Sequence, residues 1–542
     1  MPKFVLLWTD VALYLIVLAV LAYAWRVRRT PTLRATWARV AHDGPAMCAA
    51  VILAVFAVIG LLDSVHFRPR LPPLPGAAAD APPAYAPAAR SLLDTLLRGT
   101  VLTEPEKTYS APLRAHQFTK ETMLVDGKPV RDFPRLRAGG AHLRDTATER
   151  LPDVLRRGGL GLLAGAAVAV VAGLLLAAAL ARAHGEWRQA LRDVLQGHTD
   201  VRWRAMWITF AGLALVAGLL GGWASGYHAL GTDRTGNDVL WQALKSIRTA
   251  LVIGSLTTLA MLPPAIVFGI AAGYFKGKVD DAIQYLYTTL TSIPGVLLVA
   301  ACVLMMQVYI DNNPALFDTS AARADLRLFL LCMILGLTGW AGLCRLLRAE
   351  ALKLRELEFV QAARAFGVSD WSIMRRHLLP NVMHIVLITV VLEFSGLVLY
   401  EAVLSYLGIG VDPSMNSFGS MINGARLEMS MDPMIYWNLG TAFAFMLALV
   451  LAANLFADAV RAAFDPRTRR FRPRRRALAA PGLVSGVFAV SPVPAEARET
   501  SREGEGPDGS PPGDDDDPDG ASLRGDSRRD SRDGPEGGGR HE

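Results

Sequence analysis

Long apolar runs recur along most of this chain, and they constrain its fold more than any other feature. A helix needs about 20 mostly apolar residues to cross a hydrocarbon core about 30 Å thick. Nine runs approach or exceed this length: residues 4–25, 47–62, 160–180, 206–223, 251–275, 283–306, 328–347, 382–409 and 435–460. Overall, 52% of the residues are hydrophobic. The sequence therefore predicts an all-α polytopic membrane protein.

The charges indicate how the chain is oriented. The basic residues gather beside the apolar runs on alternate sides, so the net charge of +7 does not indicate nucleic-acid binding. Arg26, Arg28 and Arg29 directly follow the first run, whereas a cleaved signal peptide carries its charge before its apolar core. We therefore expect an uncleaved anchor with its N-terminus outside. Because cytoplasmic loops are enriched in Lys and Arg, residues 26–43 are expected inside, and nine spans then leave the C-terminus in the cytoplasm.

Composition divides the chain into five parts. Residues 1–62 contain two spans, and residues 63–158 open with a Pro/Ala-rich stretch and form an extracytoplasmic domain. Residues 159–205 contain the third span and its cytoplasmic connection, and residues 206–468 contain the remaining six spans. Residues 469–542 are first basic and then rich in Gly, Pro, Asp and Ser, which predicts a disordered cytoplasmic tail. The extracytoplasmic domain is either a contact for substrate or binding protein or a structural cap.

A charge-rich segment, residues 350–380, separates two of the apolar runs. One helical stripe in it is apolar and has the spacing i, i+3, i+4, i+7: Phe359, Ala362, Ala363 and Phe366. Gly367 stands where a helix would end in a left-handed residue. Ser369 or Asp370 can cap a second short helix, and Pro380 stands where the next span begins. The segment is therefore expected to form a helix–glycine turn–helix at a membrane surface.

This segment resembles the EAA loop of the permease subunits of binding-protein-dependent ABC importers. The resemblance is carried by Gln361, Ala362, Ala363, Gly367, Leu379 and Pro380. Gln361 stands where the family usually has glutamate, which keeps the size and the hydrogen-bonding capacity but loses a charge. In the family, this loop is the cytoplasmic element that docks into a groove on a separate ATPase.

Three further stretches resemble the oligopeptide, dipeptide and nickel branch of these permeases. The first is Gly231-Thr232-Asp233 followed by Gly236-Asn237-Asp238, and it precedes an amphipathic helix. Asn237 stands where the branch often has arginine. The others are EAVLSYLGIG at 401–410 and FADAVRAAFDPR at 456–467. The resemblance covers about residues 200–468. It implies a type I ABC importer permease core of about six helices (a MetI-like fold), extended here by about three N-terminal helices and the extracytoplasmic insert.

The resemblance also implies the partners: a second homologous permease subunit, ABC ATPase subunits beneath, an extracytoplasmic solute-binding protein above, and the lipid bilayer of a bacterial inner membrane. Docking on the ATPase would rest on the apolar stripe and the residues around it. The ATPase-coupling residues are Phe359, Gln361, Ala362, Ala363, Phe366, Gly367, Arg364, Arg375, Arg376 and Pro380, in which the three arginines supply charge pairs.

We expect no catalytic residues and no bound cofactor in this chain. The P-loop pattern G-x-x-x-x-G-K-[ST] is missing from the sequence, so ATP and Mg would be used by the partner ATPase. Cys48, Cys302, Cys332 and Cys344 lie within or beside the apolar runs, so no disulfide framework is implied. The spacing of potential ligands suggests no metal site.

Ionisable residues inside spans mark functional sites by default. Glu401, near the outer end of the eighth run, either faces the translocation path or bonds a neighbouring helix. Glu393 in the same run is expected to be a packing partner. Pro263, Pro264 and Pro294 either kink spans to line a cavity or are structural.

Two other functions fit the sequence less well. A secondary transporter driven by an ion gradient would need two related halves, and the sequence has no such internal repeat. A membrane scaffold with a binding domain fits the N-terminal extension but leaves residues 200–468 unexplained. The preferred function is an ATP-driven importer of peptides or similar small solutes, since peptides are the commonest cargo of the branch, although nickel is also carried there.

Overall fold

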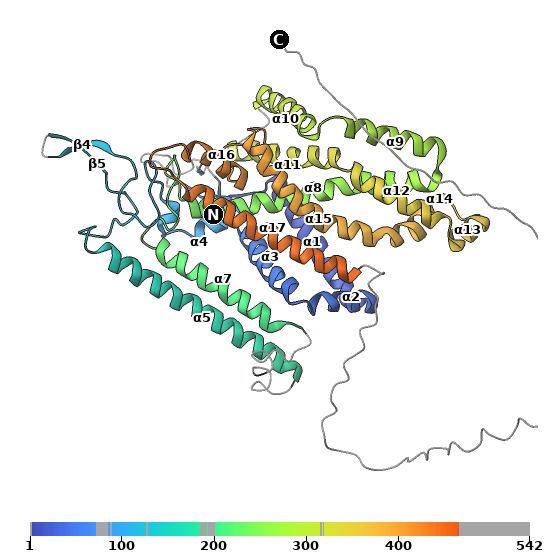
Figure 1. Cartoon of the computed structure of the whole chain (residues 1–542), viewed down its shortest axis with the longest axis horizontal. Helices are drawn as coiled ribbons and strands as arrows, with labels where there is room; N and C mark the ends of the chain where they lie inside the picture. Colours follow the sequence, from blue (N-terminus) through green and yellow to red (C-terminus); the bar gives the residue numbers. More distant parts are fainter. Residues whose placement is uncertain are drawn as a thin grey trace, which may run out of the picture. The chain divides into compact units, whose positions relative to one another are not determined.

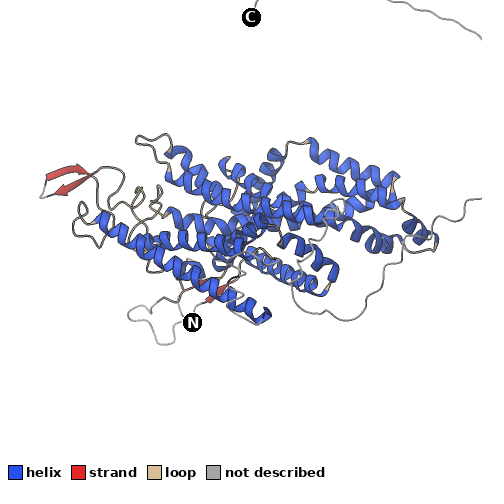
Figure 2. Cartoon of the chain, turned by 60° about the horizontal axis from the view of Figure 1, so that its bottom comes forward, coloured by secondary structure: helices blue, strands red, loops and turns tan. Residues whose placement is uncertain are grey.

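Helices dominate the computed structural model of the chain (Figure 1; Figure 2). The structure describes residues 3–71, 85–86, 89–125, 128–184, 192, 201–314, 317 and 319–464. The chain divides into two compact units, Met1–Phe471 and Arg472–Glu542, and the described residues all belong to the first. The tail predicted at 469–542 lies outside the described residues.

Within the described residues, eight helical segments are long and apolar enough to cross a membrane. They are α1 (Trp8–Arg29), α3 (Gly44–Asp63), α5 (Arg150–His184), α7 (Trp203–Ala224), α8 (Val239–Phe275), α10 (Gly295–Asn312), the segment Asp370–Tyr406 that includes α15 (Leu379–Tyr406), and α17 (Trp437–Phe464). A ninth span results if α11 (Ser320–Gly339) and α12 (Ala341–Arg355), which meet at an angle of 40°, count as one. The prediction of an all-α polytopic membrane protein is confirmed.

One predicted span is wrong in its bounds. The apolar run 283–306 is divided between α9 (Gly277–Ser292) and α10 (Gly295–Asn312). The break falls at Ile293 and Pro294, where Ile293 is extended. Proline disfavours a helical conformation in the residue before it and provides no N–H for the helix ladder, which accounts for the break at this position.

α8 shows the opposite behaviour. Pro263 and Pro264 lie inside it, and the helix nevertheless runs for 37 residues. The amphipathic helix predicted before the fifth span is therefore the first part of α8. Asp238 caps its start, with Oδ1 accepting a hydrogen bond from the Trp241 backbone N–H at 3.0 Å. α8 packs against α3, α11, α12 and α15, and such neighbours help a membrane helix tolerate proline.

The 63–158 region lies within the first compact unit and has mixed structure up to the start of α5. Strand β2 (His66–Arg68) pairs with β3 (Arg90–Ser91) and with β1 (Lys3–Val5), which comes from the start of the chain. α4 (Leu92–Leu96) and the 3-10 turn η1 (Val101–Thr103) follow, and then the antiparallel hairpin β4 (Glu121–Val125) and β5 (Lys128–Asp132). We refer to this region as the 63–158 domain.

The remaining elements complete the helical body. α2 (Pro31–Ala41) joins α1 to α3, and α16 (Phe418–Glu428) lies between α15 and α17. The 350–380 segment contributes α13 (Glu358–Ala365), α14 (Asp370–Ile373) and the π turn η3 (Met374–Leu378). In Figure 1, α13 and α14 lie at the opposite end of the helices from α4, β4 and β5.

α5 and α7 run side by side as a closely packed pair (Figure 1). Four glycines make the close approach possible: Gly161, Gly165, Gly218 and Gly222. A Cβ on Gly218 would overlap the carbonyl oxygen of Gly161. Small residues at such positions let membrane helices pack backbone to backbone.

Candidate functional site

The 350–380 segment has the helix–glycine turn–helix form expected from its sequence. Gly367 has a φ of +75°, a conformation that glycine adopts without strain. Its N–H donates to the Arg364 carbonyl at 3.0 Å, and the Val368 N–H donates to the Ala363 carbonyl at 3.1 Å. Ser369 is the N-cap residue of α14, although its side chain makes no capping hydrogen bond. The glycine thus ends α13 and turns the chain into α14.

The inward side of the segment is apolar and buried. Val360 is 2% exposed, and Ile373 and Leu378 are fully buried. They pack in one cluster with Tyr274 of α8 and Leu347 of α12. Hydrophobic burial therefore seats the segment on these two helices.

The outward side is also apolar, but it has no cover within the described residues. Phe366 is 87% exposed and Trp371 is 64% exposed. Leu357, Phe359 and Val368 are exposed as well, and we call these five residues the apolar tip. Of the predicted stripe, Phe359, Ala362 and Phe366 are exposed, whereas Ala363 is half-buried. Sequence reasoning missed Trp371, although a tryptophan in a charge-rich loop was a visible signal.

The other residues expected around the tip are exposed too. These are Gln361, Arg364, Arg375, Arg376 and Pro380. Gln361 Nε2 donates to the Glu356 carbonyl at 3.1 Å. Within the described part of the chain, the three arginines form no ion pair, so their charges remain available.

Polar bonds tie the segment to the end of α8, and they tie α12, the helix that leads into the segment, to α9. Tyr274 Oη donates to Asp370 Oδ1 at 2.6 Å, and Arg355 Nη1 donates to the Tyr274 carbonyl at 2.8 Å. Arg348 of α12 binds Asp280 of α9 with two hydrogen bonds, of 2.5 and 2.7 Å. Any displacement of α14 therefore acts directly on the end of α8.

The other end of α8 makes three polar contacts with the N-terminal part of the chain, and the first is at Arg248. Trp241, Lys245 and Arg248 lie within about 60° of one another on the helix and just beyond the capping residue Asp238. Arg248 is 4% exposed, and its Nη2 donates to Asp10 Oδ1 at 2.5 Å and lies 3.4 Å from Asp325 Oδ1. One buried guanidinium thus joins α1, α8 and α11.

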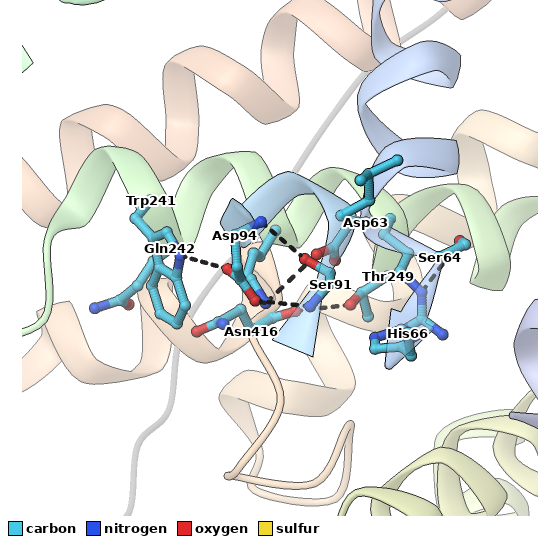
Figure 3. A network of polar contacts seen from close by, with 12 residues as sticks. Asp63, Ser64, His66, Ser91, Asp94, Trp241, Gln242, Thr249 and Asn416 are labelled. Atoms are coloured by element: carbon cyan, nitrogen blue, oxygen red, sulfur yellow. Dashed lines mark hydrogen bonds and ion pairs between the residues drawn. The ribbon is translucent and has the colours of Figure 1, made fainter. Parts of the chain in front are cut away.

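The second contact on this face is the network of Figure 3. Lys245 Nζ lies 3.0 Å from Asp94 Oδ2 of α4 and 3.4 Å from Asp63 Oδ1 at the end of α3. Trp241 Nε1 donates to Asp94 Oδ1 at 3.0 Å. Ser91 and Asp94 also form the capping box that starts α4. The same carboxylate therefore starts α4 and anchors it on α8.

The third contact is a fully buried histidine between two carboxylates. His228 Nδ1 donates to Asp238 Oδ2 at 2.8 Å, and Nε2 lies 3.4 Å from Glu106 Oε1. Burial alone would lower the pKa of His228, but the hydrogen bonds to Asp238 and Glu106 raise it to about 9. Burial would raise the pKa of Glu106, but His228 and three backbone N–H groups lower it to about 2. An imidazolium between two carboxylates is the charge state that these values imply.

The glycine-rich turn of the sequence is where the 63–158 domain rests. The Glu106 N–H donates to the Gly236 carbonyl at 2.9 Å, and the Thr232 N–H donates to the Ser110 carbonyl at 3.0 Å. Gly236 has a φ of +80°, and a Cβ there would overlap Glu106. The sequence indicated a turn and a helix cap at this place. Nothing in the sequence indicated that this turn also binds the 63–158 domain.

The two glutamates of α15 have opposite environments. Glu401 is 2% exposed, and its Oε1 accepts a hydrogen bond from Ser405 Oγ at 2.6 Å beside Gly419 of α16. These are the contacts of a carboxylate that joins two helices. Glu393 is exposed and makes no hydrogen bond with another described residue. The expectation that Glu393 is a packing partner therefore stays a prediction, because this side chain is exposed and has no hydrogen-bond partner among the described residues.

Among the described residues, no group of three or more His, Cys, Asp and Glu side chains could hold a metal ion. All four cysteines have free thiols.

Comparison with known proteins covers the part of the chain that contains this segment. The profile of the family described as "Binding-protein-dependent transport system inner membrane component" matches residues 265–470. The oligopeptide transport system permease protein OppC of Haemophilus influenzae is 30% identical over 244 residues, which cover 45% of this chain and 72% of the relative. The glutathione transport system permease protein GsiD of Pectobacterium atrosepticum is 30% identical over 245 residues, 45% of this chain and 74% of the relative. The dipeptide transport system permease protein DppC of Lactococcus lactis is 28% identical over 240 residues, 44% of this chain and 64% of the relative.

Proposed function

Because this chain belongs to the family of inner membrane components of binding-protein-dependent transport systems, we propose that its 350–380 segment is the surface that binds a separate ATPase subunit. The chain is a multi-pass permease subunit of an ABC importer and a transport component rather than an enzyme. Family membership favours an ATP-driven importer over a transporter driven by an ion gradient.

The apolar tip is the observation that supports this docking surface. Five large apolar side chains are exposed on a segment that also carries three exposed arginines, and these form no ion pair with the described residues. A contiguous exposed apolar patch with a polar rim is typical of protein–protein interaction sites. An apolar anchor such as Phe366 would fill a pocket on the ATPase, and Arg364, Arg375 and Arg376 would pair with acidic residues at its rim.

The bonds behind the tip give the docking a mechanical consequence. The inward side of the segment is buried against α8 and α12, and Tyr274 holds α14 through Asp370. When ATP closes the ATPase subunits, a docked segment would move with them. The movement would then pass into α8 and open the translocation path to one side of the membrane at a time.

The remaining partners follow from the family. We infer a second homologous permease subunit, which would complete the translocation path, and an extracytoplasmic solute-binding protein, which would deliver the solute. ATP and Mg would be used by the ATPase, and this chain would bind no cofactor. The chain would lie in a bacterial inner membrane with its N-terminus outside and its C-terminus in the cytoplasm.

Peptides are the proposed cargo. Two of the three relatives named above are called oligopeptide or dipeptide transport permeases, and the third is called a glutathione transport permease. Glutathione is itself a small peptide, so the three names share one class of solute.

Co-purification with the candidate ATPase subunits tests the docking surface. Phe366→Asp removes the most exposed apolar side chain of the tip, and because this side chain is exposed we expect the variant to keep its fold. Leu124→Asp is the matched control, because Leu124 is 79% exposed on the β4–β5 hairpin at the opposite end of the protein. The intact chain and Leu124→Asp are expected to retain the ATPase, whereas Phe366→Asp is expected to lose it. Retention of the ATPase by Phe366→Asp would contradict the proposal.

A further inference from the structure

One face of α15 is polar and uncovered at the middle of the helix. Thr389, Glu393, Gly396 and Tyr400 follow the spacing i, i+4, i+7, i+11 and lie within about 60° of one another. Glu393 and Gly396 are exposed, and Thr389 and Tyr400 are half-buried. We call these four residues the α15 polar face. It differs from the rest of α15, whose exposed side chains include Leu392, Leu399 and Val403.

The position of Glu393 makes its exposure informative. It lies 14 residues after Leu379 and 13 before Tyr406, which places it about 20 Å from either end of α15. A carboxylate at this depth is costly in lipid and is found facing a bundle interior or a water-filled cavity. Within this single chain, however, the side chain faces outward and has no partner among the described residues.

The neighbours of Glu393 on the face support contact with water or solute. Neither Thr389 nor Tyr400 donates a side-chain hydrogen bond to another described residue, so three polar groups of this face have no hydrogen-bond partner in the part of the chain that the structure describes. A Cβ on Gly396 would have no atom within 4 Å, so the chain leaves open space beside Glu393. Lipid would satisfy none of these groups, whereas an aqueous path would satisfy all of them.

We propose that the α15 polar face lines the translocation path and that Glu393 binds a cationic group of the solute during passage. This inference rests on the proposed transport function and adds a residue to it. For a peptide, the cationic group is the N-terminal ammonium, which a carboxylate binds through charge-assisted hydrogen bonds. Glu401, eight residues further along, points to a different side of α15 and is already bonded to Ser405.

Thiol labelling tests the first half of the proposal in the assembled transporter. Cys48 and Cys302 are replaced by alanine because they are the two cysteines that are not fully buried. Glu393→Cys is then compared with Val168→Cys, whose side chain is exposed near the middle of α5 on the peripheral α5–α7 pair. A charged, water-soluble thiosulfonate is expected to label Glu393→Cys at least 10-fold faster. Equal, slow labelling of both positions would overturn the assignment of the face to the path.

Uptake kinetics test the second half. The probes are the tripeptide Ala-Phe-Ala and its N-acetylated form, taken up by proteoliposomes that contain the full transporter and its binding protein. Glu393→Gln is expected to raise the KM for the free peptide at least 10-fold and to change the KM for the acetylated peptide less than twofold. Comparing each peptide between variant and wild type removes the preference of the binding protein itself. Equal effects on both peptides, or no effect on either, would overturn the role of Glu393.

Two controls separate this inference from the proposed function. Asp311→Asn removes an exposed carboxylate at the end of α10 and is expected to change neither KM. Glu393→Gln is expected to retain the ATPase on co-purification, as the intact chain does. If the ATPase is retained but the labelling or the kinetic result fails, only the α15 assignment falls. If the intact chain never retains an ATPase, the proposed function falls instead.

Discussion

Arg248 of α8 donates a hydrogen bond of 2.5 Å to Asp10 of α1, a residue 238 positions earlier in the chain, in a site that solvent barely reaches. Asp325 of α11 lies 3.4 Å from the same guanidinium. This pairing makes the N-terminal extension an integral part of the permease. It joins an added helix to two helices of the part that resembles the family.

Replacing Arg248 should therefore destabilise the whole membrane domain. Arg248→Met keeps much of the apolar stem but leaves Asp10 and Asp325 buried without a cation. Breaking one partner of a buried ion pair costs about 3–5 kcal/mol. Unfolding of the full chain in detergent should show a loss of this size, and adding Asp10→Asn and Asp325→Asn should recover part of it. Arg98→Met, at an exposed arginine, is the control. An unchanged midpoint for Arg248→Met would show that the network contributes nothing.

The contact between Glu106, His228 and Asp238 should make the seat of the 63–158 domain sensitive to alkali. The pKa of His228 is raised from 6.5 to about 9, so its contribution to stability is complete below pH 6.5 and is lost as the pH rises to about 9. The pKa of Glu106 is lowered to about 2, so its contribution is complete above about pH 4.5 and is lost at lower pH. The contact should be strongest between about pH 4.5 and 6.5.

Thermal unfolding of the full chain between pH 6 and 9.5 measures this effect. The wild type should lose stability across the range, by an amount on the order of a few kcal/mol. His228→Gln should be less stable at pH 6 and should lack the alkaline loss. A wild-type chain and a variant with parallel pH profiles would rule out the charged form of His228.

The hydrogen bond from Tyr274 to Asp370 should matter for coupling more than for assembly. Tyr274→Phe removes a bond to a charged group, worth about 1.5–3 kcal/mol, and leaves the buried ring in place. We expect the ATPase to remain bound while the peptide transported per ATP hydrolysed falls severalfold. Tyr285→Phe, at a tyrosine that is 75% exposed on α9, should change neither quantity. Loss of the ATPase itself would mean that Tyr274 maintains the docking surface rather than the link behind it.

The α5–α7 pair offers a prediction with an internal control. Gly218→Ala places a methyl group against the Gly161 carbonyl, whereas Gly221→Ala places one where no atom lies within 4 Å. Both changes give the same gain in helix propensity, so their difference isolates packing. Gly218→Ala should be less stable than Gly221→Ala by about 1–3 kcal/mol. Equal unfolding midpoints would show that the two helices are not as close as described.

Part of this architecture could be predicted from the sequence. Whether a proline breaks a membrane helix could not be predicted from the apolar run alone. The apolar runs locate the membrane helices because hydrophobic length is a local property. Pro294 breaks its run, whereas Pro263 and Pro264 do not break α8, although all three lie in apolar runs. Two things differ: Thr291, Ser292 and Gly295 flank the break at Pro294, and α8 packs against α3, α11, α12 and α15, which only the tertiary structure shows.

The candidate site also has a part that the sequence predicts and a part that only the packing of neighbouring helices decides. Gly367 and the spacing of Phe359 and Phe366 predicted the turn and the exposed stripe, since both depend on helix periodicity and backbone conformation. Trp371 belongs to the apolar tip because Val360 and Ile373, not Trp371, meet α8 and α12. That choice of side is made by the neighbouring helices.

The sequence by itself thus determined the number of apolar runs, the helix–glycine turn–helix, and the family, because each rests on residues close together in the chain. Only the tertiary structure decided that Glu401 is enclosed while Glu393 faces outward, and that Arg248 meets Asp10. The physical reason is the same for both. Periodicity fixes which residues share a face of a helix, but the face that becomes buried depends on helices that are distant in sequence and adjacent in space.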